Sequence, residues 1–311
     1  MPGIVHEQVE ANGIKLHVAR GGPSAADAAL QEPAPLILFL HGFPDYWACW
    51  QAQLEYFADR GYTAVAPDLR GFNLSDKPEG VEAYRAKHLI GDVAALAARF
   101  AGGRKFTLVA HDWGGAVAWG YAMAKPETLS GLVICNSPHP YTFWRELCNN
   151  PAQQQASDYF HLFREVGKAE HVLAKDDFAK LWGMISGDWG VGGRSGSEAD
   201  RKAFVEAMSQ PGALTGGLNY YRATPMVPPK GDIPGARAMQ LDPKDFVVRV
   251  PTLVVWGEQD RALLPVLLDG LDALVPDLKI VRVPDAGHWV MRQQPDLVNR
   301  EIAAFLEKAG R

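Results

Sequence analysis

The sequence predicts an α/β fold with a mostly parallel central sheet, helices on both faces, and an inserted helical cap domain. Short apolar runs typical of buried strands alternate with helical stretches in the first part of the chain and again near its end, which is the pattern of a parallel sheet covered on both sides. Between residues 139 and 234 this alternation stops, and amphipathic stretches alternate with loops. We therefore expect a core domain of residues 1–138 and 235–311, and a cap domain of residues 139–234.

The first elements of the core follow from turn and burial patterns. Apolar and polar residues alternate over 4–9 and 14–19, on the two sides of Asn12-Gly13. This pattern is typical of a β-hairpin. A polar, alanine-rich stretch at 25–32 predicts a surface insertion. The elements expected next, in chain order, are a strand from residue 36, a helix over 47–60, a strand over 63–67, a loop over 68–80, a helix over 82–100, a strand over 106–110, a helix ending at 124 and a strand over 131–136.

The cap and the end of the chain have signals of their own. The proline-containing segments 138–140 and 226–231 predict hinges at the two ends of the cap, and the glycine-rich stretch 186–197 predicts a mobile lid loop. After the cap we expect a buried strand within 251–257, a strand over 278–283 and a C-terminal helix over 296–308.

Composition excludes several classes of function. The chain has 311 residues, is 47% hydrophobic and has a formal charge of -5, so it can bury a large core. Its basic residues are scattered, which leaves nucleic-acid binding without an electrostatic basis. No signal-peptide pattern or membrane-length apolar run is present, so we expect a soluble cytoplasmic monomer or homodimer. The three cysteines match no metal-site spacing and are expected to be reduced; no metal or organic cofactor is predicted.

Asp112 is the candidate nucleophile. It follows the apolar strand over 106–110 and begins a helix, and the small residues Ala110 and Gly114 flank it. Small neighbours let the chain turn sharply enough to raise one side chain, as in a nucleophile elbow. The alternative is that Asp112 merely caps the helix. An aspartate nucleophile attacks saturated carbon and becomes an alkyl ester, whereas a serine would form an acyl-enzyme.

Two later residues complete a predicted catalytic triad. Asp260 follows a buried strand in a glycine-containing loop, and His288 follows the strand over 278–283. The order nucleophile, acid, histidine is the order that this kind of site requires, and strand-end positions bring all three residues to the carboxyl edge of a parallel sheet. Taken singly, Asp260 is an ordinary Asx-turn residue and His288 an ordinary loop residue.

A fourth segment supplies the predicted oxyanion hole. The strand from residue 36 ends in His41-Gly-Phe-Pro, whose backbone N–H groups are positioned to face the elbow. We assign the two donors to the backbone amides of Phe43 and Trp113, the latter directly after the nucleophile. The alternative is an ordinary strand-ending turn.

Motifs along nearly the whole chain resemble those of the epoxide hydrolase group of α/β-hydrolases. The resemblance implies an α/β-hydrolase fold, an epoxide hydrolase activity and a cis bond between Phe43 and Pro44. The His-Asp-Trp-Gly motif is shared with haloalkane dehalogenases, whereas His-Gly-Phe-Pro together with Leu-Asn-Tyr-Tyr-Arg is more specific to epoxide hydrolases. The matching segments are His41-Gly-Phe-Pro, His111-Asp-Trp-Gly-Gly, Asn136-Ser-Pro-His-Pro, Leu218-Asn-Tyr-Tyr-Arg, Trp256-Gly-Glu-Gln-Asp and Gly287-His.

The resemblance also implies the acid that protonates the epoxide oxygen. Tyr221 matches the ring-opening tyrosine of the family, and a tyrosine with a pKa of about 10 stays protonated at neutral pH. Tyr220 points about 100° away on the same helix and cannot share the role. For the second donor the chain resembles a variant with histidine, which points to His161; Tyr159 is the alternative. The alternative interpretation is that Tyr221 and His161 are packing residues.

These observations predict an epoxide hydrolase that makes a vicinal diol through a hydroxyalkyl ester on Asp112, with water as the second substrate. Phe43, Trp113 and Tyr159 are the expected substrate-binding residues.

The first alternative is haloalkane or haloacid dehalogenation by the same attack. Haloalkane dehalogenases commonly have Asn where Phe43 stands, and the arginines of fluoroacetate dehalogenases would fall at Trp113 and Ala116. The second alternative is a noncatalytic protein that binds an apolar ligand. Aromatic residues in the cap favour an apolar substrate: Phe143, Trp144, Phe160, Phe163, Trp182 and Trp189.

Overall fold

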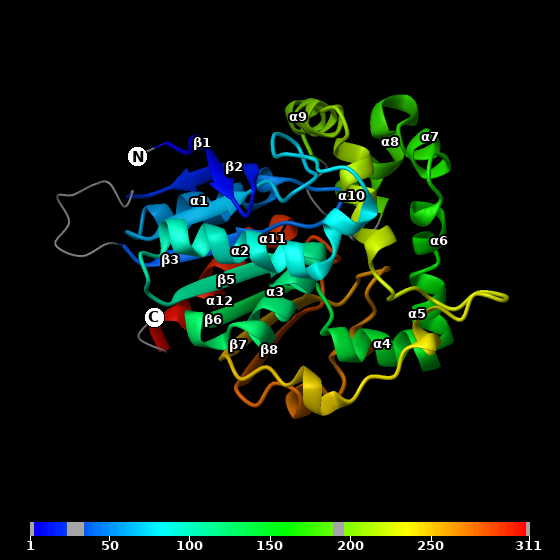
Figure 1. Ribbon diagram of the computed structural model, residues 1–311. Helices are drawn as coiled ribbons and strands as arrows, with labels where there is room; N and C mark the ends of the chain where they lie inside the picture. Colours follow the sequence, from blue (N-terminus) through cyan, green and yellow to red (C-terminus); the bar gives the residue numbers. More distant parts are fainter. Residues whose placement is uncertain (1–2, 24–33, 189–195, 309–311) are drawn as a thin grey trace.

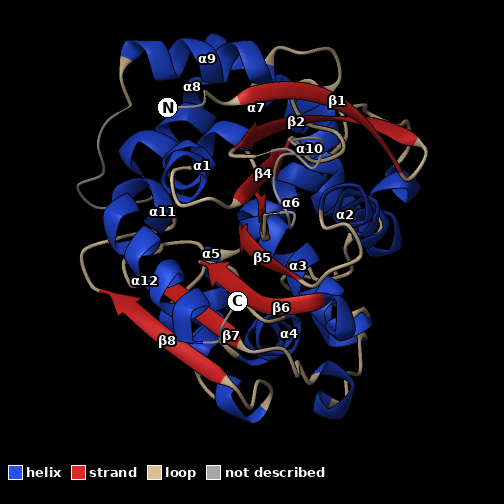
Figure 2. Ribbon diagram, turned by 90° about the vertical axis from the view of Figure 1, so that its left-hand side faces the viewer, coloured by secondary structure: helices blue, strands red, loops and turns tan. Residues whose placement is uncertain are grey.

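A computed structural model describes residues 3–23, 34–188 and 196–308 and confirms the mostly parallel sheet. In the described part of the chain the sheet has eight strands in the order β1-β2-β4-β3-β5-β6-β7-β8. Pairing is antiparallel from β1 through β4 and parallel from β4 to β8 (Figures 1 and 2). The strands are β1 (Val5–Ala11), β2 (Ile14–Gly21), β3 (Leu36–Leu40), β4 (Thr63–Pro67), β5 (Phe106–His111), β6 (Leu129–Cys135), β7 (Thr252–Gly257) and β8 (Leu278–Val283).

The predicted hairpin is confirmed at the edge of the sheet. Asn12 and Gly13 join β1 to β2 with φ values of 53° and 79°. Positive φ at both central residues is what a type I′ turn requires, and Asn-Gly is the pair that adopts it at least cost.

Helices cover both faces of the sheet, as predicted. Figure 2 shows α1 (Gln51–Ala58), α11 (Val290–Gln293) and α12 (Pro295–Lys308) on one face, and α2 (Ala86–Phe100) and α3 (Asp112–Ala124) on the other. The central strands between these layers are buried along their whole length. Parallel strands sandwiched in this way hold their carboxyl ends in fixed relative positions.

The chain between β6 and β7 is helical, and in Figure 1 it lies to one side of the sheet. Among its described residues we find no strand, only an isolated bridge between Lys230 and Ile233. The division of the chain into core and cap domains remains a prediction. The helices are α4 (Pro140–Asn149), α5 (Pro151–Ala156), α6 (Tyr159–Arg164), α7 (Lys168–Leu173), α8 (Lys175–Gly183), α9 (Glu198–Met208) and α10 (Ala213–Ala223).

Two of the predicted helices are shorter than expected. The helix predicted over 47–60 is a 3₁₀ turn, Trp47–Trp50, followed by α1, and the helix predicted over 82–100 is a 3₁₀ turn, Val81–Tyr84, followed by α2. Arg85 separates the second pair because its ψ of 150° is extended rather than helical.

Other predictions concern single residues or lie outside the described parts. The Phe43–Pro44 bond is cis and the three cysteines are free, both as expected. The insertion at 25–32 and residues 189–195 of the predicted lid loop, with Trp189, lie outside the described residues. None of the described helices combines the length and apolar character needed to cross a membrane.

Candidate active site

Asp112 lies at a sharp turn between β5 and α3. Its φ of 50° is in the left-handed region, which costs a non-glycine residue of order 1–3 kcal/mol and persists only where the surroundings enforce it. A Cβ on Gly114 would lie 2.4 Å from the carbonyl oxygens of Leu40 and His41, and a Cβ on Gly115 would lie 2.3 Å from the Cβ of Ser137. Only glycine fits at these two positions, which gives the turn the geometry of a nucleophile elbow.

The predicted backbone donors converge on the Asp112 carboxylate. The Phe43 N–H donates to Oδ1 at 2.9 Å, and the Trp113 N–H donates to the same carboxylate. Gly42 permits this approach, since a Cβ there would lie 2.2 Å from Oδ1. Burial raises the pKa of Asp112 above its usual value, while nearby His288 and the two N–H donors act to lower it. The two donors therefore stabilise the ionised form of the carboxylate against the effect of burial.

Asp260 and His288 complete the arrangement at the ends of β7 and β8. The His288 Nδ1 is 2.7 Å from Oδ2 of Asp260, so Nδ1 carries the proton that it donates to the carboxylate. The other nitrogen, Nε2, then points its lone pair to the Asp112 side and lies 3.7 Å from Oδ2 of Asp112. The backbone N–H groups of Ala262 and Leu263 donate to Oδ1 of Asp260 at 2.9 Å. Sequence reasoning brought these three residues together, and the structure does the same.

Asn136 is a positioning residue that sequence reasoning missed. It follows β6, with φ of 36°, between the strands that carry Asp112 and Asp260. Its Nδ2 donates to Oδ2 of Asp260 at 2.9 Å, and its Oδ1 accepts from the Gly257 N–H at 2.8 Å. Its place at a strand end in the Asn-Ser-Pro-His-Pro motif was the only available signal.

His111, directly before the nucleophile, was also missed. Its Nε2 lies 2.9 Å from the carbonyl oxygen of His288, and the two rings pack with centroids 4.6 Å apart. Burial holds the pKa of His111 well below its usual range, so the ring is neutral and Nε2–H is the donor. This contact fixes the backbone at His288.

Tyr221 of α10 and Tyr159 of α6 face Asp112 from the helical segment. Their hydroxyl groups hydrogen-bond each other, and the Trp113 indole N–H donates to the Tyr221 hydroxyl. Burial is the largest cause raising the pKa of both tyrosines well above the usual value, so both remain protonated donors. Tyr220 points elsewhere, as expected, and donates to the Arg70 carbonyl at 3.0 Å.

Arg164 links the two helices that carry these tyrosines. It lies at the end of α6, and its guanidinium donates to the carbonyl oxygens of Tyr221, Arg222 and Thr224 at the end of α10. These carbonyls have no partners within their own helix. Satisfying them from α6 holds Tyr159 and Tyr221 in one relative position.

The structure does not bring His161 to Tyr221. His161 hydrogen-bonds the backbone of Pro228 and lies near Lys230 and Asp158. The described residues lining the two cavities beside Asp112 include Tyr159 but not His161. Two residues apart on a helix, the two side chains point about 200° apart, so only one of them can reach Tyr221.

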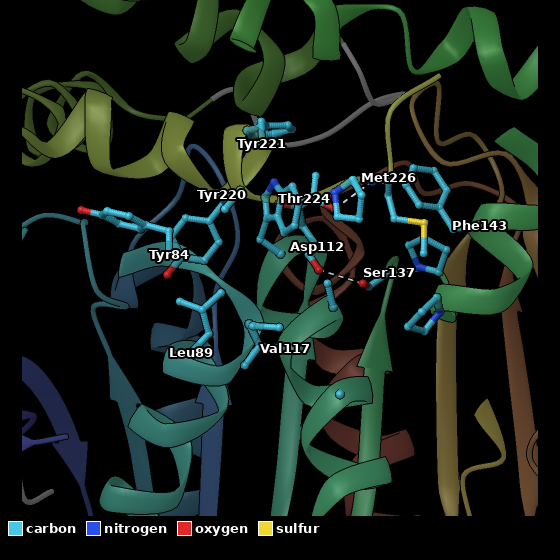
Figure 3. A pocket seen from close by; sticks show the side chains of 18 of the residues that line it. Tyr84, Leu89, Asp112, Val117, Ser137, Phe143, Tyr220, Tyr221, Thr224 and Met226 are labelled. Carbon is cyan, nitrogen blue, oxygen red and sulfur yellow. Dashed lines mark hydrogen bonds between the residues drawn. The ribbon is translucent and has the colours of Figure 1, made fainter. Parts of the chain in front are cut away.

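Two cavities meet at Asp112, Tyr159 and Tyr221. The large cavity has a volume of about 340 Å³; Figure 3 shows Asp112 at its centre, with Leu89 and Val117 on one side and Phe143 and Met226 on the other. Asp112 is the only Asp, Glu, Lys, Arg or His among the described residues that line it. The small cavity, of about 10 Å³, lies beside His288, and such a volume holds about one water molecule.

Comparisons with known proteins show which fold family and which proteins the chain is similar to. A model of the alpha/beta hydrolase fold family matches residues 35–295. The chain is 36% identical over 309 residues to the AB hydrolase superfamily protein YfhM of Bacillus subtilis (strain 168), covering 99% of each. It is 32% identical over 308 residues to Epoxide hydrolase 4 of Mus musculus, covering 98% of this chain and 79% of the mouse protein. A solved structure from a study of novel epoxide hydrolases in metagenomes from hot environments is 37% identical with a TM-score of 0.84, covering 98% of this chain and 99% of that one.

Proposed function

The chain belongs to the α/β-hydrolase family and, within it, to the epoxide hydrolases, and we propose that it opens apolar epoxides to vicinal diols through a covalent ester on Asp112. One observation carries the proposal: a carboxylate held by two N–H donors shares a cavity with two buried tyrosine hydroxyls and a histidine. Such a set provides a nucleophile, an acid and a base for the two halves of one reaction.

In the first half, an oxygen of Asp112 forms a bond to one epoxide carbon while that carbon loses its bond to the ring oxygen. The electrons of the broken bond pass to the ring oxygen, which takes a proton from the Tyr159–Tyr221 pair. An alkoxide is a stronger base than a phenolate, so this transfer is favourable even with the raised pKa of both tyrosines. We propose Tyr159, rather than His161, as the partner of Tyr221 because the two hydroxyls hydrogen-bond each other.

In the second half, His288 takes a proton from a water molecule, which attacks the carbonyl carbon of the ester. The Phe43 and Trp113 amides stabilise the oxyanion that forms, and losing such a donor typically costs about 2.7–4 kcal/mol in the barrier. The tetrahedral intermediate then expels the diol oxygen that came from Asp112, and this oxygen takes the proton held by His288. The second proton of the water returns to the tyrosine that was deprotonated in the first half, and the carboxylate regains its oxygen from water. The small cavity between Asp112 and His288 supports this step because it has room for the attacking water.

The charge of Asp112 also couples the two halves. Burial alone would lower the pKa of His288, but the charges of Asp260 and Asp112 and the bond to Asp260 outweigh burial and raise it. Ester formation neutralises Asp112, so the pKa of His288 falls when the ring must act as a base. Alkylation thereby prepares the site for hydrolysis.

Mildly acidic pH is expected to slow hydrolysis of the alkyl-enzyme. In that intermediate Asp112 is an ester and does not titrate, while Asp260 still acts to raise the pKa of His288. The histidine gains its proton as the pH falls through its pKa, and the base is then lost. Intact-protein mass spectrometry after acid quench follows the decay of alkyl-enzyme that is formed at neutral pH and then shifted to a series of lower pH values. A decay rate that stays constant or rises with decreasing pH contradicts the assignment of His288.

Removing either phenol hydroxyl is expected to slow ring opening. Tyr221→Phe and Tyr159→Phe should each reduce the rate of alkylation by about a hundredfold, since a positioned acid contributes roughly 10²–10⁴. Rapid acid quench followed by intact-protein mass spectrometry measures the rate of this step directly. His161→Gln is the matched control and should alkylate at the normal rate. The reverse result, a slow His161 variant and a normal Tyr159 variant, restores His161 as the donor.

Dehalogenation by the same attack is less well supported. Phe43 has no side-chain donor for a halide, and the Trp113 indole N–H already donates to Tyr221. No Arg or Lys is found among the described residues that line the large cavity, so the carboxylate of a haloacid has no cation to bind there. The negative charge of Asp112 also disfavours an anionic substrate such as a haloacid.

A side-by-side assay with matched epoxides and haloalkanes tests the proposed activity. We expect diol from the epoxides and no halide release above the uncatalysed rate. Halide release without diol formation establishes the dehalogenase alternative. Binding of both compound classes without turnover establishes the noncatalytic alternative.

A further inference from the structure

The room for a substrate lies almost entirely on one side of Asp112. The large and small cavities share Asp112, Tyr159 and Tyr221, the residues that flank the reacting ring, but their volumes are about 340 Å³ and 10 Å³. Among the cavities whose walls the structure describes, the one on the His288 side has room for only about one water molecule. Substituents of the epoxide must therefore leave the ring in one direction.

The large cavity continues as a groove along α3, which we call the α3 groove. On the α3 side it is lined by Ala116, Gly120 and Met123. These residues lie on the same helix face as Asp112, because residues spaced three or four apart are neighbours on the surface of a helix. Gly120 is eight residues beyond the nucleophile, about 12 Å along the helix axis. Ile90 of α2 lies across from Gly120, since a Cβ on Gly120 would meet its Cδ1 at 3.2 Å.

The α3 groove opens to solvent at its rim. Ala86 at the start of α2 and Pro225 beyond α10 both line the cavity and are exposed. Thr224 and Met226 form the wall on the helical side (Figure 3). A chain-like apolar group can thus extend from the ring along α3 toward the surface, and its burial along the way contributes to binding.

We infer that the preferred substrates are terminal epoxides, in which one ring carbon is unsubstituted and the other carries a single long apolar group that lies in the α3 groove. This inference rests on the proposed function and deepens it. An internal epoxide with an alkyl group on each ring carbon needs room in both directions, and the His288 side offers none. Within the groove, Gly120 determines the usable length because any larger residue there meets Ile90.

The first test compares isomers of equal size, 1,2-epoxydecane and 5,6-epoxydecane. The wild-type kcat/KM is expected to favour the terminal isomer on the order of a hundredfold, since each buried methylene contributes a factor of about four and one butyl group of the internal isomer finds no room. Equal kcat/KM values for the two isomers overturn the inference but leave the proposed function intact.

The second test shortens the groove. Gly120→Leu is expected to lower the ratio of kcat/KM for 1,2-epoxydecane to that for 1,2-epoxybutane by about 20-fold, which corresponds to two or three methylene contacts. Ala124→Leu is the matched control: it adds the same side chain one turn further along α3, at an exposed position outside the cavity, and should leave the ratio unchanged. Thermal denaturation of both variants confirms that they fold. An unchanged ratio in Gly120→Leu overturns the role of the groove.

A binding measurement separates failure of the inference from failure of the proposed function. If the wild type hydrolyses no epoxide, the proposed activity is wrong, and the groove is then tested with the unreactive ligand decane-1,2-diol. Weaker binding of this diol to Gly120→Leu than to Ala124→Leu, by about the same 20-fold factor, supports the groove. Equal binding to the two variants overturns it.

Discussion

Asp112→Ala is expected to abolish turnover, with kcat/KM for epoxides falling by roughly 10⁴-fold or more, as for other nucleophile deletions. No other carboxylate lies both at the elbow and within reach of the Phe43 and Trp113 donors among the described residues, so neither half of the reaction can begin. Folding should be preserved, because the variant removes a buried charge whose desolvation is unfavourable. The measurement is kcat/KM together with intact-protein mass after addition of epoxide.

The matched control for this variant removes a carboxylate near the same helices. Asp158 directly precedes Tyr159, but its side chain is exposed and pairs with Lys230 at 2.7 Å. Exposed ion pairs contribute about 0–1 kcal/mol, so Asp158→Ala should retain its activity. A covalent adduct, or residual turnover near the wild-type rate, in Asp112→Ala contradicts the assignment of the nucleophile.

His288→Gln is expected to trap the alkyl-enzyme. Alkylation needs only the Asp112 nucleophile and the tyrosine pair, whereas hydrolysis needs the base at Nε2. A glutamine retains a donor for Asp260 and provides no base. One equivalent of epoxide mass should therefore appear on the protein within the time of a normal turnover, while steady-state diol formation falls by roughly 10⁴-fold.

The same exchange at His161 serves as the control, because His161 contacts Pro228 and lies outside the two cavities. His161→Gln should form diol at the normal rate and accumulate no adduct. Continued substrate consumption by His288→Gln without an adduct would contradict the scheme in which His288 is the base that hydrolyses a covalent ester.

The triad was predictable because its members occupy strand ends. Asp112, Asp260 and His288 each follow an apolar run that the sequence marks as a strand, and parallel strands end at a common edge. The Phe43 amide was predictable for the same reason. Asn136 also follows a strand, but its partner Asp260 is 124 residues away, and which groups meet across neighbouring strands depends on their register.

The choice between Tyr159 and His161 was not predictable. Helical spacing predicts that the two side chains point in different directions, but it does not predict which direction faces Asp112. That direction is set by contacts of α6 with the rest of the molecule, including the bonds from Arg164 to the end of α10. The break at Arg85, which separates the 3₁₀ turn Val81–Tyr84 from α2, was likewise not predictable, because no turn residue marks it in the sequence. The cytoplasmic location and the monomeric or homodimeric state remain predictions.

Single-turnover hydrolysis in water labelled with oxygen-18 tests the covalent ester on Asp112 most directly. With enzyme in excess over a single epoxide, we expect an unlabelled diol, because its new oxygen comes from the side chain of Asp112. The peptide that contains Asp112 should then gain one labelled oxygen. A labelled diol together with an unlabelled Asp112 peptide would mean that water attacks the epoxide directly, and would contradict the mechanism.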